Sequence, residues 1–465
     1  MRHYIYIILA FLFTNVVLLT SCKKKDILST DGISFTTDTL LFDTIFTTVG
    51  STTLNFRIHN TSNRPVKVDE IALMGEANSN FRINVDGISG DVHTDITIPA
   101  KDSIYTFVEV TLDPNNGTTP LIIEDSIRFS VNGNYSYVLL AAWGQDAYFY
   151  NRDTISGVLP NDKPHVVYSS VRVVDGQDLT IPAGTDFYMH KNAIFYVSES
   201  ALNINGTVDD PVTFQGDRLE DFYDDVAGQY YGIYFDHAKT STINHAIIKN
   251  GTSGIHIFET HPSNTDYTVK LYNTELYNHA SYGLFNFLNG TVYGENVSIH
   301  SNGTYAYFSL VGGDYYFKQS NFLSYGGNAS VAFALRNHYT DVDAQTTYYN
   351  GVNEGKFYNC ILDATGDNSF GFDTINDDNN SINFNFEFDY CALKAKDEIT
   401  DDSRISNILW NRFLGFENQS EKDFHLTAGS PLIDAGSTDF THSNGIDIEE
   451  NPRTGVPDIG AYEFQ

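Results

Sequence analysis

The chain has 465 residues, enough for two or three domains with a large buried core. Acidic residues outnumber basic ones by 59 to 27, and the resulting formal charge of −32 repels phosphate backbones, so nucleic acid is not an expected partner. Aromatic residues make up 14% of the chain, which indicates a folded protein and not an acidic disordered one, and the abundance of Thr, Asn and Gly favours β structure.

The N-terminus has the regions of a secretion signal. Arg2 and His3 precede an apolar stretch, 4–19, which is short for a membrane span of about 20 residues. The next residues, "LTSC", resemble the lipobox of bacterial lipoproteins, in which a diacylglyceryl group is attached to the cysteine and cleavage occurs before it. This resemblance implies a signal peptide at 1–21 and lipidation at Cys22. The alternative is an ordinary signal peptide that ends near a cysteine.

Residues 22–35 are expected to form a lipidated tether, so that the membrane is a partner through the lipid anchor. The sequence "KKKD" after the cysteine resembles the charged residues next to the anchor in surface-exported lipoproteins of Bacteroidetes, although those signals are usually richer in acids. The resemblance implies a cell-envelope protein on the outer-membrane surface, facing outside. The inner leaflet of the outer membrane is the alternative.

Short alternating segments fill residues 36–149. In "TLNFRIHN", Leu54, Phe56 and Ile58 point to one side, and turn signals such as "NTSNRP" and "NVDGISG" separate about seven such segments. This spacing predicts a β-sandwich. The stretches "FRIHNTSNRPVKV", "IPAKDS" and "VTLDPNNG" resemble immunoglobulin-like sandwiches of the abnormal-spindle and Hydin type. That resemblance implies a spacer or docking module, and we find no candidate site in it.

Residues 150–425 carry an internal repeat in which a small residue, any residue and a large apolar residue follow one another. The second members lie 28, 23, 23, 40 and 31 residues apart. Two or three short strands per turn of about 23 residues are typical of a right-handed parallel β-helix, in which turns stack at about 4.8 Å and residues of the same phase form ladders inside the coil. The pairs are Ala246/Ile248, Thr274/Leu276, Val297/Ile299, Ser320/Phe322, Cys360/Leu362 and Cys391/Leu393.

Longer stretches support the same fold. "DLTIPAGTDFYMHKNAIFYVS" and "YYGIYFDHAKTSTINHAIIKNG" resemble the opening turns of secreted β-helix proteins of the pectate-lyase-like superfold, and "FHLTAGSPLIDAG" and "PDIGAYEF" are similar to the ending of many of them. The resemblance implies the fold for about 165–465. It does not imply one function, because this superfold hosts lyases, hydrolases, esterases, adhesins and inert stalks.

Cys360 and Cys391 occupy the same phase of successive turns, in "FYNCIL" and "FDYCAL". We therefore expect both to stack inside the coil as buried free thiols. Neighbouring turns would place their Cα atoms about 5 Å apart, a separation that a disulfide can also span.

The final residues, 426–465, mix carboxylates with apolar side chains. We expect them to fold back as a C-terminal cap over the last turn of the β-helix, with the acids capping turns or pairing with Arg453. A calcium ion held by Asp434, Asp447 or Asp458 is the less favoured alternative, since calcium accepts several carboxylate oxygens.

A second acidic cluster lies in "GDRLEDFYDDVAGQYYG", between two predicted strands. Asp221, Asp224 and Asp225 are candidate calcium ligands there, and a calcium ion could hold a uronic-acid substrate. We favour a solvated loop without such a role. Calcium is thus the one metal for which the sequence offers ligands, and no cofactor is required.

The long insertion "RNHYTDVDAQTTYYNGVNEG" is the best candidate for a binding site. Arg336, Tyr339, Tyr348 and Tyr349 could hold a sugar, because tyrosine rings stack on pyranose faces and arginine pairs with carboxylates. His338, with Arg336 and Tyr339, is the candidate for acid–base catalysis of an elimination. The alternative is an aromatic loop that packs on its own coil.

The expected fold class is all-β: an immunoglobulin-like β-sandwich, then a right-handed parallel β-helix with a C-terminal cap. Our leading hypothesis is a lipid-anchored protein that engages extracellular glycans or has a structural role, because no catalytic signature of the superfold is evident. The alternatives are a polysaccharide lyase or glycoside hydrolase acting on an extended, uronic or neutral, polymer, and an adhesin or stalk that binds a protein. Aligned aromatic residues would favour glycan binding, and a convergent cluster of a base and carboxylates would favour an enzyme.

Overall fold

The structure is a computed structural model that describes residues 32–47, 50–112, 121–325, 331–375, 382–441 and 444–465. The predicted signal peptide, the lipidation site Cys22 and most of the predicted tether lie outside these residues. Within the described ranges, no helix has the length and apolar character needed to cross a membrane. The chain divides into two compact units between Asp146 and Ala147.

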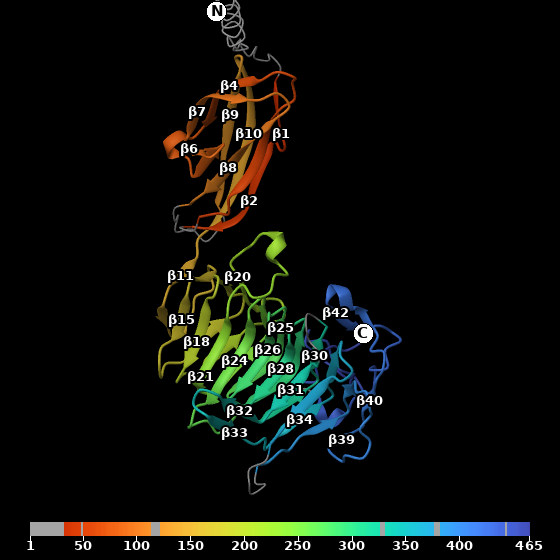
Figure 1. The fold of residues 1–465 in the computed structure, drawn as a ribbon. Helices are drawn as coiled ribbons and strands as arrows, with labels where there is room; N and C mark the ends of the chain where they lie inside the picture. The colour runs from red at the N-terminus through yellow and green to blue at the C-terminus, as the bar shows by residue number, and fades with distance from the viewer. Residues whose placement is uncertain (1–31, 48–49, 113–120, 326–330, 376–381, 442–443) are drawn as a thin grey trace, which may run out of the picture. The chain divides into compact units, whose positions relative to one another are not determined.

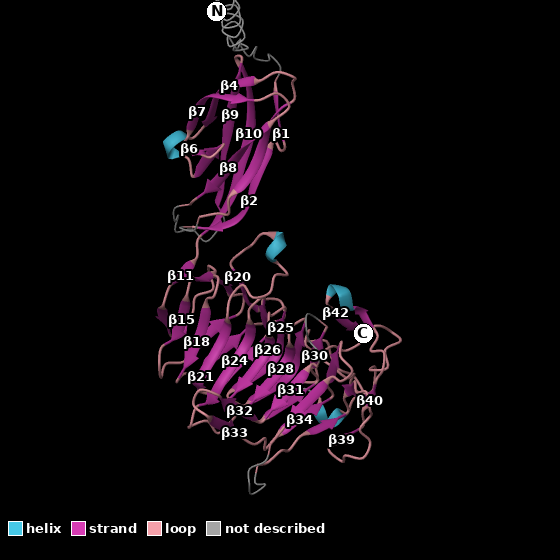
Figure 2. Ribbon diagram, viewed as in Figure 1, coloured by secondary structure: helices cyan, strands magenta, loops and turns pink. Residues whose placement is uncertain are grey.

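The first unit is a β-sandwich of two five-stranded sheets (Figures 1 and 2). Strand β8 shows why these segments pair: its residues alternate between buried and exposed, so one face enters the core. The first sheet has the order β1 (Ile33–Phe35), β3 (Leu54–Asn60), β8 (Ser103–Val110), β5 (Phe81–Val85) and β6 (Ile88–Ser89). The second has the order β2 (Thr39–Phe46), β10 (Asn134–Gln145), β9 (Leu121–Val131), β4 (Val66–Leu73) and β7 (Val92–Ile98).

Both predicted ends of the sandwich differ from the structure. Residues Ile33–Phe35 were expected in the tether, but they form β1 and pair with β3. At the other end, residues Tyr148–Tyr150 form β11, which pairs with β14 of the second unit, so the boundary lies before the predicted 149/150. In both places the strand has only three residues, which is too short for a sequence pattern that would indicate the strand it pairs with.

The second unit is a coil of parallel strands that lie on three sides (Figure 1). One side is a nine-stranded sheet in which every strand pairs with the equivalent strand one turn away. Its strands are β12 (Asp153–Ile155), β15 (Ser170–Val173), β18 (Ile194–Ser198), β21 (Gly232–Ala238), β24 (Ser253–Thr260), β26 (Tyr282–Phe287), β28 (Tyr305–Leu310), β31 (Phe333–Arg336) and β36 (Phe370–Asp373).

The other two sides belong to one nineteen-stranded sheet that turns a corner. The first row has β13 (Gly157–Val158), β16 (Leu179–Pro182), β19 (Leu202–Asn205), β22 (Ser241–Asn244), β29 (Tyr315–Lys318), β34 (Gly355–Tyr358), β37 (Glu387–Asp389) and β39 (Ile405–Ser406). The second row has β11 (Tyr148–Tyr150), β14 (His165–Val167), β17 (Asp186–Met189), β20 (Val212–Gly216), β23 (Ala246–Lys249), β30 (Asn321–Ser324), β35 (Ile361–Ala364), β38 (Ala392–Leu393) and β40 (Leu409–Trp410).

Two long strands, β25 (Val269–Tyr277) and β27 (Val292–His300), pass through the corner and belong to both rows. Asn273 and Asn296 stand at the corner with φ of 47° and 51°, a left-handed conformation that asparagine tolerates well. The Asn296 amide donates to Asn273 Oδ1 at 3.0 Å, and the Asn273 amide donates to Asn244 Oδ1 at 3.2 Å. This ladder holds successive corners in register.

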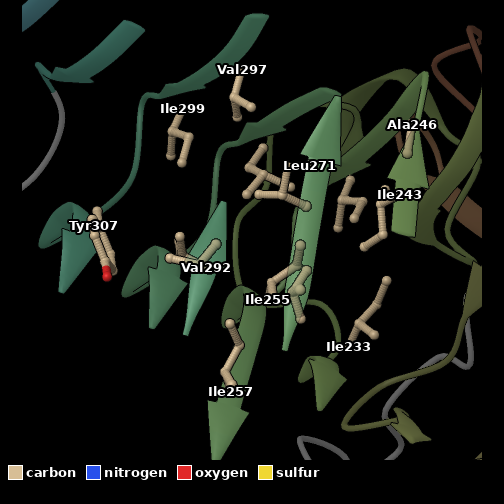
Figure 3. Close-up of a cluster of buried hydrophobic side chains, with 14 of the residues drawn as sticks. Ile233, Ile243, Ala246, Ile255, Ile257, Leu271, Val292, Val297, Ile299 and Tyr307 are labelled. Atoms are coloured by element: carbon tan, nitrogen blue, oxygen red, sulfur yellow. The ribbon is translucent and has the colours of Figure 1, made fainter. Parts of the chain in front are cut away.

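Apolar side chains of the same phase fill the coil. Ile233 and Ile255 lie opposite each other, and Leu284 and Tyr307 follow in the next two turns, all of them buried. Figure 3 shows Ile233, Ile255 and Tyr307 in this core together with side chains from the other two sides. The predicted fold class, an all-β chain with a parallel β-helix after a β-sandwich, is confirmed, whereas the immunoglobulin-like type of the sandwich stays a prediction.

Cys360 and Cys391 lie inside the coil in adjacent turns as fully buried free thiols. Cys360 Sγ donates to Tyr358 O and Cys391 Sγ donates to Phe357 O, both at 3.2 Å. Of the two states that the sequence left open, the structure has the free thiols.

The C-terminal segment, 426–465, folds back onto the side of the coil. It runs along the outer side of the second row and the corner, where Tyr462 Oη donates to Glu275 Oε1 at 2.8 Å and Gly460 N donates to Asn359 O at 2.9 Å. The apolar side chains of this side, among them Leu323, Ile361 and Ala392, form a second core with the segment. The segment thus covers outward apolar residues of several turns, including Leu409 of the last strand, while a cap over the end of the coil stays a prediction.

The remaining short elements are one hairpin over the second row, one hairpin after β31, and four single-turn 3₁₀ helices. They are β41 (Phe416–Asn418), β42 (Asp423–Leu426), β32 (His338–Asp341), β33 (Thr346–Tyr349), η1 (Glu76–Asn78), η2 (Asp221–Tyr223), η3 (Gln419–Glu421) and η4 (Thr438–Phe440).

Candidate functional site

Outward side chains of the nine-stranded sheet are aromatic over most of its length. Inward positions such as Phe195 and Phe235 are buried, and the alternation of a strand sends their neighbours outward. Register places these outward rings directly beside one another from turn to turn. We call the following residues the aromatic stripe: Tyr196, Tyr234, His256, Phe258, Phe285, Phe287 and Phe308.

The rings of the aromatic stripe touch in sequence. Ring centroids are 5.4 Å apart for Tyr196 and Tyr234, 4.5 Å for Tyr234 and His256, 4.5 Å for His256 and Phe285, and 5.5 Å for Phe285 and Phe308. Parallel strands about 4.8 Å apart impose this spacing on side chains of the same phase. The result is a continuous run of rings across β18, β21, β24, β26 and β28, which lie side by side in Figure 2, and every ring is half-buried except that of His256, which is buried.

His256 belongs to the stripe as a neutral ring. Burial lowers its pKa to about 4, so it carries no charge at neutral pH. The Tyr231 hydroxyl and His256 Nδ1 are 2.6 Å apart, which fits a bond from the hydroxyl to an unprotonated nitrogen.

Acidic and imidazole side chains line the edge of the sheet where β18, β21 and β24 end. His237 Nδ1 lies 2.6 Å from Asp236 Oδ1, and His237 Nε2 lies 3.0 Å from Glu259 Oε2. His261, which follows β24, has its Nε2 3.2 Å from Oε2 of Glu199, which follows β18. We call these five residues the edge cluster.

Backbone geometry builds the edge cluster. Glu199, His237 and Glu259 occupy equivalent positions of three successive turns, and all three have a left-handed backbone with φ of 53°, 49° and 60°. The hydrogen bond to Asp236 raises the pKa of His237, burial opposes this, and the charge of Glu259 adds to it. Tyr196 of the aromatic stripe donates its hydroxyl to Asp236, which joins the edge cluster to the stripe.

This arrangement offers two kinds of chemistry. The rings can pack against the C–H faces of sugars, while the carboxylates can accept hydrogen bonds from hydroxyl groups. His237, held between two carboxylates, can also carry a proton.

The hairpin of β32 and β33 stands beside the stripe and contains the residues that the sequence singled out. Tyr339 lies opposite Tyr348, and His338 lies opposite Tyr349, so the two pairs occupy opposite faces of the hairpin. The ring of Tyr339 meets Phe287 of the stripe edge-on, with centroids 5.9 Å apart. Tyr339 and Tyr348 therefore share the face that contacts the stripe.

The structure separates the other predicted residues of this site. Because neighbours on a strand point to opposite faces, His338 is turned away from Tyr339, and the two do not converge as an acid–base pair. Arg336 ends β31 and binds Asp373 of the next turn, with Nε 2.8 Å from Oδ2. Tyr349 is on the His338 face, away from the stripe.

The acidic loop between β20 and β21 is polar and open. Asp221 begins η2, Asp225 forms an ion pair with Lys422, and Asp224 O accepts a hydrogen bond from the Asn250 amide at 2.8 Å. These contacts tie the loop to its neighbours.

The carboxylates of the C-terminal segment bind backbone amides. Asp447 Oδ1 accepts from Glu449 N at 2.9 Å and from Asn451 N at 2.8 Å. Asp458 Oδ1 accepts from Asp434 N at 2.8 Å. Across the described ranges, no three side chains of the His, Cys, Asp and Glu types lie together so that they could hold a metal ion.

The hairpin tyrosines were predictable from the sequence, whereas the aromatic stripe and the edge cluster were not. The missed signal is the outward aromatic residue in "GIYFD", "GIHIF", "GLFNF" and "AYFSL". Reading it requires the register between turns, because inward positions of the same strands are also apolar.

No family model matches the chain, and no curated protein matches it. Among solved structures, a family 123 glycoside hydrolase from Clostridium perfringens has 8% identity and a TM-score of 0.18, and the match covers 26% of this chain and 30% of that one. The A-module of a mannuronan C-5 epimerase from Azotobacter vinelandii has 11% identity and a TM-score of 0.29 over 57% of this chain and 90% of that one.

The catalytic domain of a GH87 α-1,3-glucanase, solved with tetrasaccharides, has 10% identity and a TM-score of 0.21, with 77% of this chain and 87% of that one covered. These identities and TM-scores are low, and the similarities carry no argument about this chain's activity. The site has to be interpreted from its own geometry.

Proposed function

We propose that this protein binds an extended glycan along the aromatic stripe on the outer face of its β-helix. The observation that carries the proposal is the unbroken run of contacting rings from Tyr196 to Phe308 on a rigid parallel sheet. A row of sugar rings presents apolar C–H faces at regular intervals, and a flat aromatic surface removes them from water.

The hairpin supplies ring surface that the stripe lacks. Rings that stack on a neighbour, such as Phe285 on Phe308, keep part of their faces covered. Tyr339 and Tyr348 are 41% and 46% exposed, and they lie on the hairpin face that touches the stripe. In this proposal, the stripe is the floor of the site and the two tyrosines pack against the side of the glycan.

The test compares three tyrosines of one hairpin in the soluble fragment 23–465. Polysaccharides that bind are first found on an array, and affinities are then measured by calorimetry with oligosaccharides. We expect Tyr339→Ala and Tyr348→Ala each to weaken binding about two- to tenfold, the loss for one aromatic contact. Tyr349→Ala removes a ring that is 50% exposed on the other face, and it should leave the affinity unchanged.

Two outcomes would count against this proposal. If no polysaccharide on the array binds, the stripe is not a glycan site. If Tyr349→Ala weakens binding as much as Tyr339→Ala does, the orientation of the hairpin is not what positions the glycan. Mass spectrometry of the same incubations checks for chain cleavage, and shortened products that disappear in His237→Asn would favour an enzyme acting at the edge cluster.

We propose further that Cys22 carries the lipid that anchors the protein in the outer membrane, facing outside. The support is the "LTSC" sequence after a short apolar stretch. Cells fed an alkyne fatty acid should label the wild-type protein and Ser21→Ala, which keeps a small residue before the cysteine, but not Cys22→Ser. Protease added to intact cells should degrade the protein, and its survival there would place it on the inner leaflet instead.

A further inference from the structure

The second inference rests on the proposed function and names the class of glycan. We infer that the aromatic stripe takes a glycan of uncharged sugars and excludes polyuronates and sulfated glycans, and that the carboxylates of the edge cluster accept hydrogen bonds from the sugar hydroxyls. The charges on and around the nine-stranded sheet carry this inference.

Negative side chains outnumber positive ones on this sheet. The nine strands contain the carboxylates Asp153, Asp236, Glu259 and Asp373, against the two arginines Arg172 and Arg336. Both arginines are already ion-paired: Arg172 Nη2 lies 2.5 Å from Asp175 Oδ1, and Arg336 Nε lies 2.8 Å from Asp373 Oδ2. These carboxylates already offset part of the positive charge that the two arginines could offer to a uronic acid.

The histidines of the sheet and its edge do not change this balance. His237 is shared by Asp236 and Glu259, and His261 lies against Glu199. His256 is buried in the stripe and neutral at physiological pH. A polyuronate that binds Arg172, Arg336, His237 or His261 would therefore compete with the carboxylate that each of them already faces.

Distance makes the repulsion effective. Glu199, Asp236 and Glu259 lie at the ends of three adjacent strands about 4.8 Å apart, a spacing shorter than the Debye length of about 8 Å at physiological ionic strength. The rest of the chain adds to this field, since its formal charge is −32. A uronate carries one negative charge on each ring, so the repulsion grows with every residue that enters the stripe.

The edge cluster can contribute hydrogen bonds to the binding of a neutral sugar. The side chains of Glu199 and Glu259 are 50% and 47% exposed, so their oxygens can accept further hydrogen bonds beside the stripe. An ionised carboxylate accepts strongly from a hydroxyl group, and the fixed left-handed backbone at these positions holds it in place. A sugar ring that packs on Tyr196 or Tyr234 would place its edge hydroxyls next to the carboxylates of the edge cluster.

The test uses pairs of oligosaccharides that share linkage and ring configuration, one member charged and the other neutral. They are α-1,4-hexagalacturonate and its full methyl ester, and β-1,4-hexamannuronate and mannohexaose, next to an array of neutral and uronic polysaccharides. We expect the neutral members to bind at least tenfold more tightly at low salt. Raising the salt to 1 M should narrow that ratio, because charge repulsion is screened while stacking is retained.

A charge-reversal variant locates the effect. Glu259→Lys should bring the uronate affinity towards the neutral one and weaken neutral binding about threefold or more. Glu124→Lys changes the net charge equally at an exposed position of β9 in the sandwich, and it should leave both affinities as they are. Thermal unfolding of each variant confirms that it is folded.

The outcomes separate the two proposals. Uronates that bind as tightly as their neutral partners would overturn the inference about charge and leave the glycan site standing. A shift of equal size in Glu259→Lys and Glu124→Lys would also overturn it, because the edge cluster would then have no local role. Failure of every neutral and uronic glycan to bind would overturn the proposed function itself.

Discussion

At the scale of single residues, the buried histidines are the side chains most sensitive to pH. His279 lies inside the turn after β25, where its Nδ1 accepts from Gly251 N at 3.1 Å and its Nε2 donates to Ile248 O at 3.1 Å. Burial lowers its pKa to about 3, and His300 in the next turn behaves in the same way. Both are therefore neutral in the folded protein over the whole range in which an exposed histidine titrates.

A lowered pKa in the folded state gives stability that is present above pH 6.5 and is lost as the pH falls towards 3, because the unfolded chain takes up the proton first. At pH 4.5 this linkage amounts to about 2–3 kcal/mol for one histidine. We expect the destabilisation by His279→Gln, measured by urea unfolding, to be about 2–3 kcal/mol smaller at pH 4.5 than at pH 7.

The comparison between variant and wild type at each pH removes the effect of other groups. Burial raises the pKa of carboxyls such as Glu275 and Asp363, and these groups change stability in the opposite direction on acidification. If His279→Gln lowers the free energy of unfolding equally at both pH values, the pKa of His279 is not lowered in the folded protein.

At the scale of elements, the C-terminal segment is organised around one buried arginine. Arg453 Nη1 lies 2.9 Å from Glu463 Oε2, and their side chains are only 1% and 7% exposed. The same guanidinium donates to Gly460 O at 2.9 Å and to Ala461 O at 3.0 Å, and it reaches Asn296 Oδ1 at the corner of the coil at 3.3 Å. One side chain thus closes the segment on itself and ties it to β27.

Loss of Arg453 should be costly because it leaves the buried Glu463 carboxylate without its charged partner. We expect Arg453→Met to lower the free energy of unfolding by about 3–5 kcal/mol, measured by denaturant unfolding. Arg404→Met is the matched control. It breaks an ion pair with Asp402 in which the arginine is 46% exposed, and such a pair contributes about 0–1 kcal/mol. Equal losses in the two variants would show that Arg453 does not organise the segment.

At the scale of the whole molecule, the β-helix was predictable because its inward positions repeat. Cys360 and Leu362 both point inward, and a small residue followed at this spacing by a large apolar one marks that phase in turn after turn. Ile361 between them points outward and is also buried, under the C-terminal segment. A strand pattern gives the face of a residue, but it does not tell whether a distant segment covers that face.

The candidate site was predictable to a smaller extent for a related reason. Tyr339 and Tyr348 stood out because they lie in a long insertion. Tyr234 and Phe285 did not stand out. Both rings contact His256, and these contacts depend on the register between turns, in which paired residues are more than 20 positions apart in the sequence. Irregular turn lengths hide that register. The same irregularity hid the edge cluster, whose members come from three turns.

The path of the C-terminal segment also has a consequence for how the coil unfolds. A stack of repeats in which each turn touches only its neighbours can lose its ends one turn at a time, and its stability is nearly a sum of local terms. Here the Tyr462 hydroxyl donates to Glu275 and Gly460 N donates to Asn359 O, so residues near the C-terminus bind turns that come much earlier in the sequence. These contacts link the C-terminal segment to several turns at once, so we expect the coil to unfold in one cooperative transition instead of fraying from its end.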